Sequence, residues 1–421
     1  METSCVIAGG GPAGMMLGLI LARAGLDVVV LEKHEDFFRD FRGDTIHPST
    51  LTLLGELGLR ERFLGLPHTS IRTLDAVVNG TRLHPIDFSR LAPPDDFLVL
   101  APQWDFLNFL AAEAADYPGF HLLMMTEATG VIEEGGGIRG VTARGPDGKF
   151  DVRAALTVAA DGRDSVVRSA AGLRPRAFGV SIDVLWFRLP KPEPVPPSTL
   201  AYVDQHGMIV TIDRGDYYQS GLIIPKGGFD ELRAKGLDAF HEVLATTAPV
   251  LAPVVKSIGS WDDVKLLNVQ INRLQRWYRT GLLAIGDAAH AMSPAFGVGV
   301  NYAIQDAVAA ANALVAPLRA GSVDLRVLDA IQERRLPPVA RMQSIQLAAH
   351  RRIARPGGAA LLPDPLPEPL RLALDAAMPL VQQFTAKMIG RGFRPESVAP
   401  ELRDPARPAP PAPPPSTRVL S

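Results

Sequence analysis

A glycine-rich turn near the N-terminus constrains this chain more than any other feature. The segment Gly9-Gly10-Gly11-Pro12-Ala13-Gly14 follows an apolar run, Cys5 to Ala8, and opens a helix-like stretch. A second apolar run, Val28 to Leu31, ends at Glu32. This order of strand, turn, helix, strand and acid predicts a βαβ unit over residues 4–32.

Each glycine of the turn has its own task at a phosphate site. Gly9 permits the tight turn, Gly11 lets the backbone approach a pyrophosphate, and Gly14 lets the helix pack close to the strand. The helix that starts at Pro12 and Ala13 presents free N–H groups and a positive dipole to the phosphate. Both ribose hydroxyls can donate to the acid at the end of the second strand, which would repel the 2′-phosphate of NADP. The pattern therefore predicts a bound adenine dinucleotide.

A second match to the same glycine spacing, residues 135–140, is interpreted as a hairpin turn. Glu133 and Glu134 precede it, and a strand-like run, Val141 to Ala143, follows where a helix would be needed. The chain therefore carries one dinucleotide fingerprint.

Composition limits the possible partners. The chain has 421 residues, of which 47% are hydrophobic and 21% charged, with a formal net charge of -2. This composition is typical of a globular protein with two or three domains. Because there is no basic run and no long apolar stretch, we expect neither nucleic acid nor a membrane span.

Cysteine usage and the N-terminus favour a cytoplasmic location. Cys5 is the one cysteine, so the chain forms no intrachain disulfide and has no CxxC redox pair. The apolar stretch from Val6 to Ala24 lacks a preceding basic segment, and its glycines fit a βα turn better than a signal peptide.

Further elements follow from periodicity and composition. We predict helices over residues 48–58, 103–115, 229–246 and 301–318, a mostly helical region over 324–391, and strands within 119–160, 198–213 and 217–225.

Two more motifs follow buried strands. Asp161-Gly162 comes directly after Leu156 to Ala160, and Asp287 comes after Gly281 to Ile285. Taken alone, Asp161-Gly162 also fits a plain turn, and Asp287 also fits a helix cap. Pro294, Gly297, Gly299, Val300 and Asn301 then lead into a helix. Behind the first fingerprint, this set resembles the class A flavoprotein monooxygenases, whose type member is para-hydroxybenzoate hydroxylase, over about residues 4–350.

The resemblance implies an α/β fold with a Rossmann-like FAD-binding domain, an inserted mixed β-sheet substrate domain and C-terminal helices. The FAD-binding domain is expected over residues 1–70, 98–178 and 276–350, the substrate domain over 71–97 and 179–275, and C-terminal helices over 351–395. Seven prolines lie between Asp404 and Ser416, so we expect residues 396–421 to form a disordered tail.

The resemblance also assigns roles at the cofactor. Glu32 would hold the ribose of FAD, Arg42 would lie near the flavin and its phosphates, and Gln103 would contact FAD. Asp161-Gly162 would serve both FAD and the nicotinamide, and Asp287 would bind the ribitol hydroxyls. The segment Gly297 to Asn301 would lie against the isoalloxazine, where its N–H groups stabilise negative charge on the reduced ring. One departure from the family pattern is Val298, which stands where a polar residue is common. No metal site is expected.

By the same resemblance, NADH or NADPH reduces FAD, and O2 adds to give a flavin C4a-hydroperoxide that hydroxylates a small aromatic substrate. The expected partners are this substrate and O2, with a monomer or homodimer as the assembly. Two alternatives stay open: a same-fold reductase, dehydrogenase or oxidative ring-opening enzyme, and a non-catalytic flavin-binding protein. The halogenase pattern Trp-x-Trp-x-Ile-Pro is absent.

No catalytic base can be identified from the sequence. His47 and Thr45 are weak candidates, because the segment around Arg42 should approach the flavin, whereas His290 is interpreted as structural. Candidate pocket residues, each of which also fits an ordinary core, are Trp186, Phe187, Tyr202, Met208 and Tyr218. Arg188, Arg214 and Lys226 could each neutralise an acidic substrate, although an apolar aromatic or polyketide-like substrate is favoured.

Overall fold

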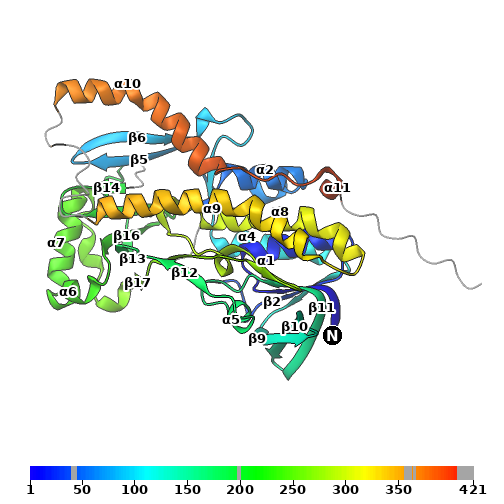
Figure 1. Ribbon diagram of the computed structural model, residues 1–421. Coiled ribbons are helices and arrows are strands. Elements are labelled where there is room, and N and C mark those ends of the chain that lie inside the picture. The colour runs from blue at the N-terminus through cyan, green and yellow to red at the C-terminus, as the bar shows by residue number, and fades with distance from the viewer. Residues whose placement is uncertain (39–44, 197–200, 355–362, 364–366, 405–421) are drawn as a thin grey trace, which may run out of the picture.

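The computed structural model describes residues 1–38, 45–196, 201–354, 363 and 367–404. Arg42 and residues 405–421 therefore lie outside the described residues. The described chain forms two large sheets with helices packed around them (Figure 1).

The first large sheet is built on the predicted βαβ unit. Strand β1 (Glu2–Ala8) pairs in parallel with β2 (Val28–Leu31) on one side and β11 (Gly148–Ala159) on the other. The described strands follow the order β19-β20-β11-β1-β2-β8, which ends at β19 (Tyr278–Arg279) and β8 (Phe120–Leu123), and β20 (Leu282–Ala284) lies between β19 and β11. Buried apolar side chains of β1 and β2 make this sheet the centre of the main core.

Helices cover this sheet. Helix α1 (Pro12–Arg23) packs against both α4 (Gln103–Ala115) and α8 (Gly299–Arg319), and α8 in turn packs against α9 (Leu325–Ile353). Smaller elements complete this part of the chain: α2 (Pro48–Glu56), α3 (Arg60–Leu64), α5 (Val166–Ala170), β3 (Thr45–Ile46), β4 (Thr69–Ile71), β7 (Leu98–Leu100), and the pair β12 (Pro175–Phe178) with β18 (Ile271–Leu274).

The second glycine cluster forms a hairpin, as predicted. Strands β9 (Glu127–Glu134) and β10 (Gly137–Gly145) are antiparallel, and Gly135 and Gly136 at the turn both have positive φ. Glycine supplies this backbone conformation without a steric penalty, so the cluster serves a turn and not a phosphate.

The second large sheet joins segments that are distant in sequence. Its described order is β17-β13-β16-β15-β14-β5-β6, from β5 (Thr73–Val78) and β6 (Thr81–Asp87) to β13 (Ile182–Pro190), β14 (Ala201–Val203), β15 (Met208–Asp213), β16 (Tyr217–Pro225) and β17 (Lys265–Leu267). Helix α7 (Leu237–Thr247) packs on one face, where the rings of Phe187 and Phe240 meet edge-on.

The single helix predicted over 229–246 is two helices. Helix α6 (Phe229–Ala234) ends before Gly236, which has a φ of 89° and precedes α7. This left-handed conformation breaks the helix, and a glycine is the residue that adopts it most easily.

The C-terminal region differs from the expectation of a tail that starts at residue 396. After α10 (Glu368–Thr385) and the π-helical turn η7 (Ala386–Arg391), residues up to 404 remain folded and include α11 (Pro400–Arg403). Val398 and Leu402 are buried in the main core. Disorder was the wrong prediction for residues 396–404, because these two apolar side chains anchor the segment.

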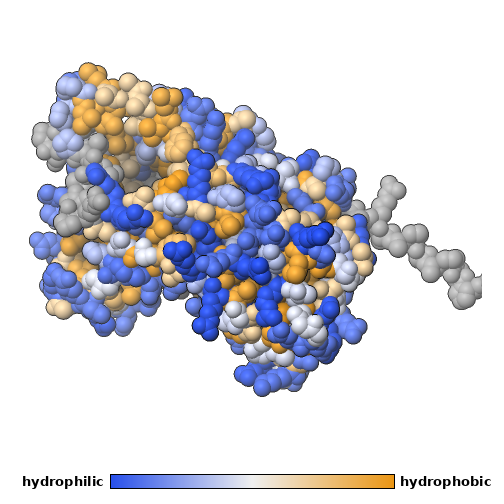
Figure 2. All heavy atoms as spheres, in the orientation of Figure 1, coloured by the Kyte–Doolittle hydropathy of each residue, from blue (hydrophilic) through white to orange (hydrophobic). Residues whose placement is uncertain are grey.

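Helix α10 lies over β6 at the top of the molecule (Figure 1). Hydrophobic side chains gather on its outer surface (Figure 2), among them Leu372, Leu380 and Phe384, each more than half exposed. Within the described residues, no helix is both long and apolar enough to cross a membrane.

Candidate functional site

The three glycines of the fingerprint turn have different surroundings. Gly9 has a φ of 106°, and a methyl group added there would lie 2.3 Å from the Ala160 carbonyl oxygen. A methyl group at Gly14 would lie 2.0 Å from the carbonyl oxygen of Gly9. At Gly11 an added methyl group would meet no atom within 4 Å. The first and third glycines are therefore needed for packing, whereas the second borders open space at the start of α1, where Pro12 is the first helical residue.

Glu32 closes the other side of this turn. Its carboxylate accepts hydrogen bonds from the backbone N–H of Gly10, at 3.0 Å, and of His34, at 3.1 Å. The side chain is buried at the end of β2. These bonds orient a carboxylate next to the phosphate turn, which suits a ribose whose hydroxyls donate.

The motifs at Asp161 and Asp287 follow the adjacent parallel strands β11 and β20, and side chains of the first motif contact the second. The Arg163 guanidinium donates to the Asp287 carboxylate at 3.1 Å, and Arg168 donates to the Ala288 carbonyl at 3.1 Å. Asp161 accepts from the Ser165 hydroxyl and from the Val167 N–H, so its carboxylate caps α5. Burial raises the pKa of Asp161, and these hydrogen bonds oppose that effect. Asp287 remains about a third exposed and can still reach a ligand.

A buried charge network contacts the backbone at Gly286, next to Asp287. The Asp306 carboxylate accepts from the Gly286 N–H, pairs with His290 at 2.5 Å, and pairs with Arg335 at 2.9 Å. Arg335 also pairs with Glu396 at 3.0 Å. Burial raises the pKa of Asp306, but His290 and Arg335 outweigh it and hold the pKa below its usual value. The structural interpretation of His290 is thus confirmed.

The loop that follows has an unusual backbone. Phe296 and Gly297 have φ values of 69° and 63°, directly before α8 begins at Gly299. Pro294 starts the preceding turn, and Val298 is fully buried in the core. A left-handed Phe296 costs conformational energy, so the surrounding structure must hold this loop in place.

Helix α9 holds the loop from one side. The Gln346 side-chain amide donates to the carbonyls of Ser293, at 3.1 Å, and Ala295, at 2.9 Å. The Ser293 hydroxyl lies 2.8 Å from Nε2 of His350. Burial lowers the pKa of His350 to about 4.

The segment that enters α2 holds the loop from the other side. Ser49 and Thr50 both donate to Oδ1 of Asn301, each at 2.7 Å, and the fully buried Asn301 amide nitrogen has no partner. Thr45 donates to the Gly297 carbonyl oxygen at 3.1 Å. An unpaired buried donor beside the free N–H groups of the first turn of α8, including that of Val300, fits a ligand with acceptor atoms.

His47 does not have the geometry of a substrate base. Its Nδ1 lies 2.8 Å from the Ile389 carbonyl oxygen and its Nε2 lies 3.0 Å from the Gly297 carbonyl oxygen. The side chain is fully buried, and burial lowers its pKa against the opposing effect of the two carbonyls. Neither nitrogen is free to take a proton from a substrate, which argues against the base hypothesis.

Gln103 begins α4 and is half-buried. Strand β7 lies just before it, and there Leu100 pairs with Thr45 of β3. Gln103 is thus brought near the same entry segment. The prediction for Arg42 falls outside the described residues.

The second sheet divides the candidate pocket residues between its two faces. Phe187, Tyr202 and Tyr218 pack in the core beneath α7. Trp186 and Met208 lie on the opposite side, because side chains alternate along a strand. Trp186 packs beside Gly221 with Val184, Val210, Ile212 and Ile223.

The cationic candidates have partners within the chain. Lys226 pairs with Asp183 at 2.7 Å, Arg214 donates to Gln219 at 2.8 Å, and Arg188 lies over the Tyr217 ring. Together with the apolar strip around Trp186, this arrangement favours a substrate with a largely apolar body.

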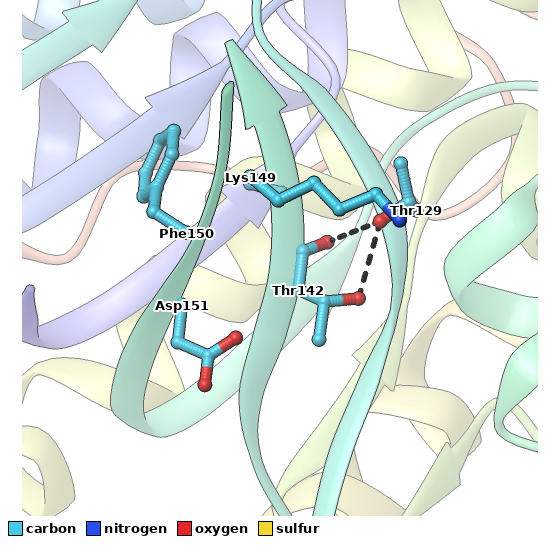
Figure 3. A pocket seen from close by; sticks show the side chains of 6 residues that line it. Thr129, Thr142, Lys149, Phe150 and Asp151 are labelled. Atoms are coloured by element: carbon cyan, nitrogen blue, oxygen red, sulfur yellow. Dashed lines mark hydrogen bonds between the residues drawn. The ribbon is translucent and has the colours of Figure 1, made fainter. Parts of the chain in front are cut away.

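Two pockets lie away from these residues. One is on the β9-β10-β11 hairpin region, lined by Thr129, Thr142, Lys149, Phe150 and Asp151 (Figure 3). The other includes Arg23, Glu56, Arg62 and Glu113. Neither contains a residue of the predicted site. Among the described side chains, no group of three or more His, Cys, Asp or Glu residues could hold a metal ion.

Comparison with known proteins agrees with this geometry. The family described as FAD binding domain matches residues 2–345. The 6-methylpretetramide 4-monooxygenase of Streptomyces rimosus is 34% identical over 85% of this chain and 85% of its own length. The chain therefore belongs to the para-hydroxybenzoate hydroxylase-like family of FAD-dependent aromatic monooxygenases. It is a flavin-dependent monooxygenase with FAD as its cofactor, and NAD(P)H is the co-substrate typical of the family.

Solved structures share the fold. The anhydrotetracycline hydroxylase OxyS from Streptomyces rimosus superposes with a TM-score of 0.71 at 23% identity, covering 93% of this chain and 76% of that one. The p-nitrophenol 4-monooxygenase PnpA from Pseudomonas putida gives 0.70 at 20% identity, covering 92% and 95%. The Rossmann-like domain with an added mixed sheet and C-terminal helices is thus confirmed as the fold class.

Proposed function

We propose that this enzyme hydroxylates an aromatic or polyketide-like substrate with a largely apolar body, using NAD(P)H as electron donor and O2 as oxygen source. The observation that carries this proposal is the apolar strip around Trp186 and Gly221 on the face of the second sheet opposite α7. The relative that acts on 6-methylpretetramide gives independent support for a substrate of this kind.

We further propose which residues hold the cofactor. The open space at Gly11 would take the pyrophosphate at the N-terminus of α1, and Glu32 would accept from the ribose hydroxyls. Asp287 would accept from the ribitol chain, and the N–H groups from Val298 to Asn301 would face the isoalloxazine. Gln103 would contact the flavin from α4.

The bound FAD supplies electron transfer from NAD(P)H and the activation of O2. This chain would contribute binding, orientation and exclusion of water. Donors at the start of α8 would favour negative charge on the reduced ring, because they are fixed in place before that charge develops. The apolar strip around Trp186 would keep water from the reacting centre.

The first test is oxidation of NADH and of NADPH by the FAD-loaded enzyme across a panel of polycyclic phenols, simple phenols and aromatic acids. We expect the larger apolar substrates to stimulate consumption most and to give products heavier by one oxygen atom. Stimulation by simple aromatic acids alone would contradict the proposed substrate class.

The same assay separates the alternatives. A product changed in hydrogen content without added oxygen would favour a same-fold reductase or dehydrogenase. Tight FAD binding without reduction by either nicotinamide would favour a flavin-binding protein. We also propose a cytoplasmic location and a monomeric or homodimeric state, which fractionation and light scattering would test.

A further inference from the structure

The peptide between Gly297 and Val298 is fixed from its carbonyl side by two side chains of one segment. Thr45 donates to the Gly297 carbonyl oxygen at 3.1 Å, and His47 places Nε2 at 3.0 Å from the same atom. An added methyl group at Gly297 would lie 2.6 Å from the Thr45 hydroxyl oxygen. The contact is therefore close enough that only glycine fits.

His47 joins this peptide to a third part of the chain. Its second nitrogen, Nδ1, lies 2.8 Å from the carbonyl oxygen of Ile389 in the turn η7. Both Ile389 and His47 are buried. The imidazole thus bridges the loop before α8 and the C-terminal turn, at the start of α2.

The backbone around this peptide does not hold itself in place. Phe296 and Gly297 both adopt the left-handed conformation, which is unfavourable for Phe296. If the bonds to the Gly297 carbonyl were lost, the 297–298 peptide could rotate, because glycine allows a wide range of backbone angles.

The orientation of this carbonyl decides where a donor points. In a trans peptide the C=O and N–H groups point in opposite directions. With the Gly297 carbonyl directed at Thr45 and His47, the Val298 N–H is directed away from them. Val298 itself is fully buried, and the next two residues, Gly299 and Val300, begin α8 with N–H groups that have no partner within the helix.

We propose that Thr45 and His47 are positioning residues, which hold the Gly297–Val298 peptide so that the half-buried Gly299 and Val300, in the first turn of α8, present their N–H groups to the flavin ring. This inference rests on the proposed placement of FAD against residues 297–301. A fixed donor at the ring stabilises the reduced, negatively charged flavin more than the oxidised flavin. The two side chains therefore set the balance between the two redox states without touching the substrate.

The test is an anaerobic titration of the flavin reduction potential in the FAD-loaded enzyme, with no substrate present. We expect Thr45→Val and His47→Leu to weaken binding of reduced flavin relative to oxidised flavin by about tenfold, a shift of about 30 mV to a more negative potential. Thr45→Ser keeps the hydroxyl, and His47→Gln keeps a donor, so both should stay within about threefold of wild type.

The matched control is His241→Gln. His241 also contacts a backbone carbonyl, that of Ile258 at 3.0 Å, but it lies on α7 against the second sheet. This variant should leave the potential unchanged.

An unchanged potential in Thr45→Val and His47→Leu would overturn the proposal, even if the affinity for FAD falls. If His47→Leu does not retain FAD, the pair Thr45→Val and Thr45→Ser decides alone, because it exchanges a single hydroxyl for a methyl group. The readout needs neither substrate nor oxygen. A failure to find hydroxylated product would therefore contradict the proposed function and leave this inference standing.

Discussion

Gly11 and Gly14 stand in the same turn, yet a methyl group added to each would meet opposite surroundings. At Gly14 it would collide with the Gly9 carbonyl oxygen at 2.0 Å, whereas at Gly11 it would enter open space. Gly14 is thus needed for the packing of helix against strand, whereas Gly11 would be needed only by the ligand of the proposed pyrophosphate site.

We therefore expect Gly14→Ala and Gly11→Ala to fail in different ways. Gly14→Ala should lower the free energy of unfolding of the apoprotein by about 1–3 kcal/mol, since helix and strand must move apart. Gly11→Ala should leave that stability nearly unchanged and weaken FAD binding by about tenfold or more. Urea unfolding and quenching of flavin fluorescence measure the two effects. A stable Gly11→Ala variant with wild-type FAD affinity would contradict the proposed pyrophosphate site.

The close packing at Gly9 and Gly14 could be predicted because it follows from one short motif. The role of Gly11 at a pyrophosphate stays a prediction. The bridge made by His47 could not be predicted, because its partners Gly297 and Ile389 lie 250 and 342 positions away. Long-range contacts of this kind leave no spacing in the sequence to recognise.

At the scale of elements, α9 holds the loop before α8 in place through hydrogen bonds. Gln343, Gln346 and His350 lie along one face of this helix, and all three are buried against residues 291–295 or their neighbours. The spacing of three and four residues places them on a single stripe. On α9 this buried polar stripe therefore marks contacts with the backbone and the Ser293 side chain of residues 291–295, and not with solvent.

Because His350 is one of these contacts, the free energy of unfolding should depend on pH. Because the folded pKa of His350 is about 4, below its ordinary 6.5, the unfolded chain binds more protons between these values. Stability is complete above about pH 6.5 and falls as the pH drops toward 4. At pH 5 the loss should be about 2 kcal/mol relative to pH 7.5.

Urea unfolding at pH 7.5 and pH 5 measures this effect. His350→Gln should remove much of the loss, while the lowered pKa of His47 contributes a remainder of the same sign. His206→Gln, at an exposed position, is the matched control. If His350→Gln kept the full pH dependence, the assignment to His350 would be wrong.

Element prediction succeeded where patterns were strong. The βαβ unit and the hairpin at residues 135–140 were found as predicted. The helix predicted over 229–246 is interrupted near Gly236, because a glycine with positive φ ends a helix even inside an apolar pattern.

At the scale of the whole molecule, the segment 396–404 packs against the main core. Glu396 pairs with Arg334 and Arg335, Val398 donates from its N–H to Glu56, and Leu402 is buried. The prolines beyond Asp404 led to the prediction that this segment belongs to a disordered tail. Burial of Val398 and Leu402 instead keeps it folded.

Truncation should separate the folded segment from the residues that follow it. A chain that ends at Pro395 loses the burial of Val398 and Leu402, and we expect its free energy of unfolding to fall by about 3–5 kcal/mol. A chain that ends at Asp404 keeps these contacts and serves as the control. Equal stability of the two truncated proteins would contradict the anchoring role.

The domain arrangement could be predicted as a class but not in detail. The family resemblance implied an added sheet, and strands from residues 73–87 and 182–267 do share one. Which face of that sheet meets α7 depends on tertiary packing, so the division between Phe187 and Trp186 emerged only from the structure.

Turnover under 18O2 with NAD(P)H, followed by mass spectrometry of the product, tests most directly whether this chain transfers an oxygen atom from O2 to an aromatic substrate at FAD. We predict one 18O atom in the product from 18O2 and none from labelled water. An oxygenated product that carries label from water, or NAD(P)H oxidation that yields only hydrogen peroxide with every substrate of the panel, would contradict it.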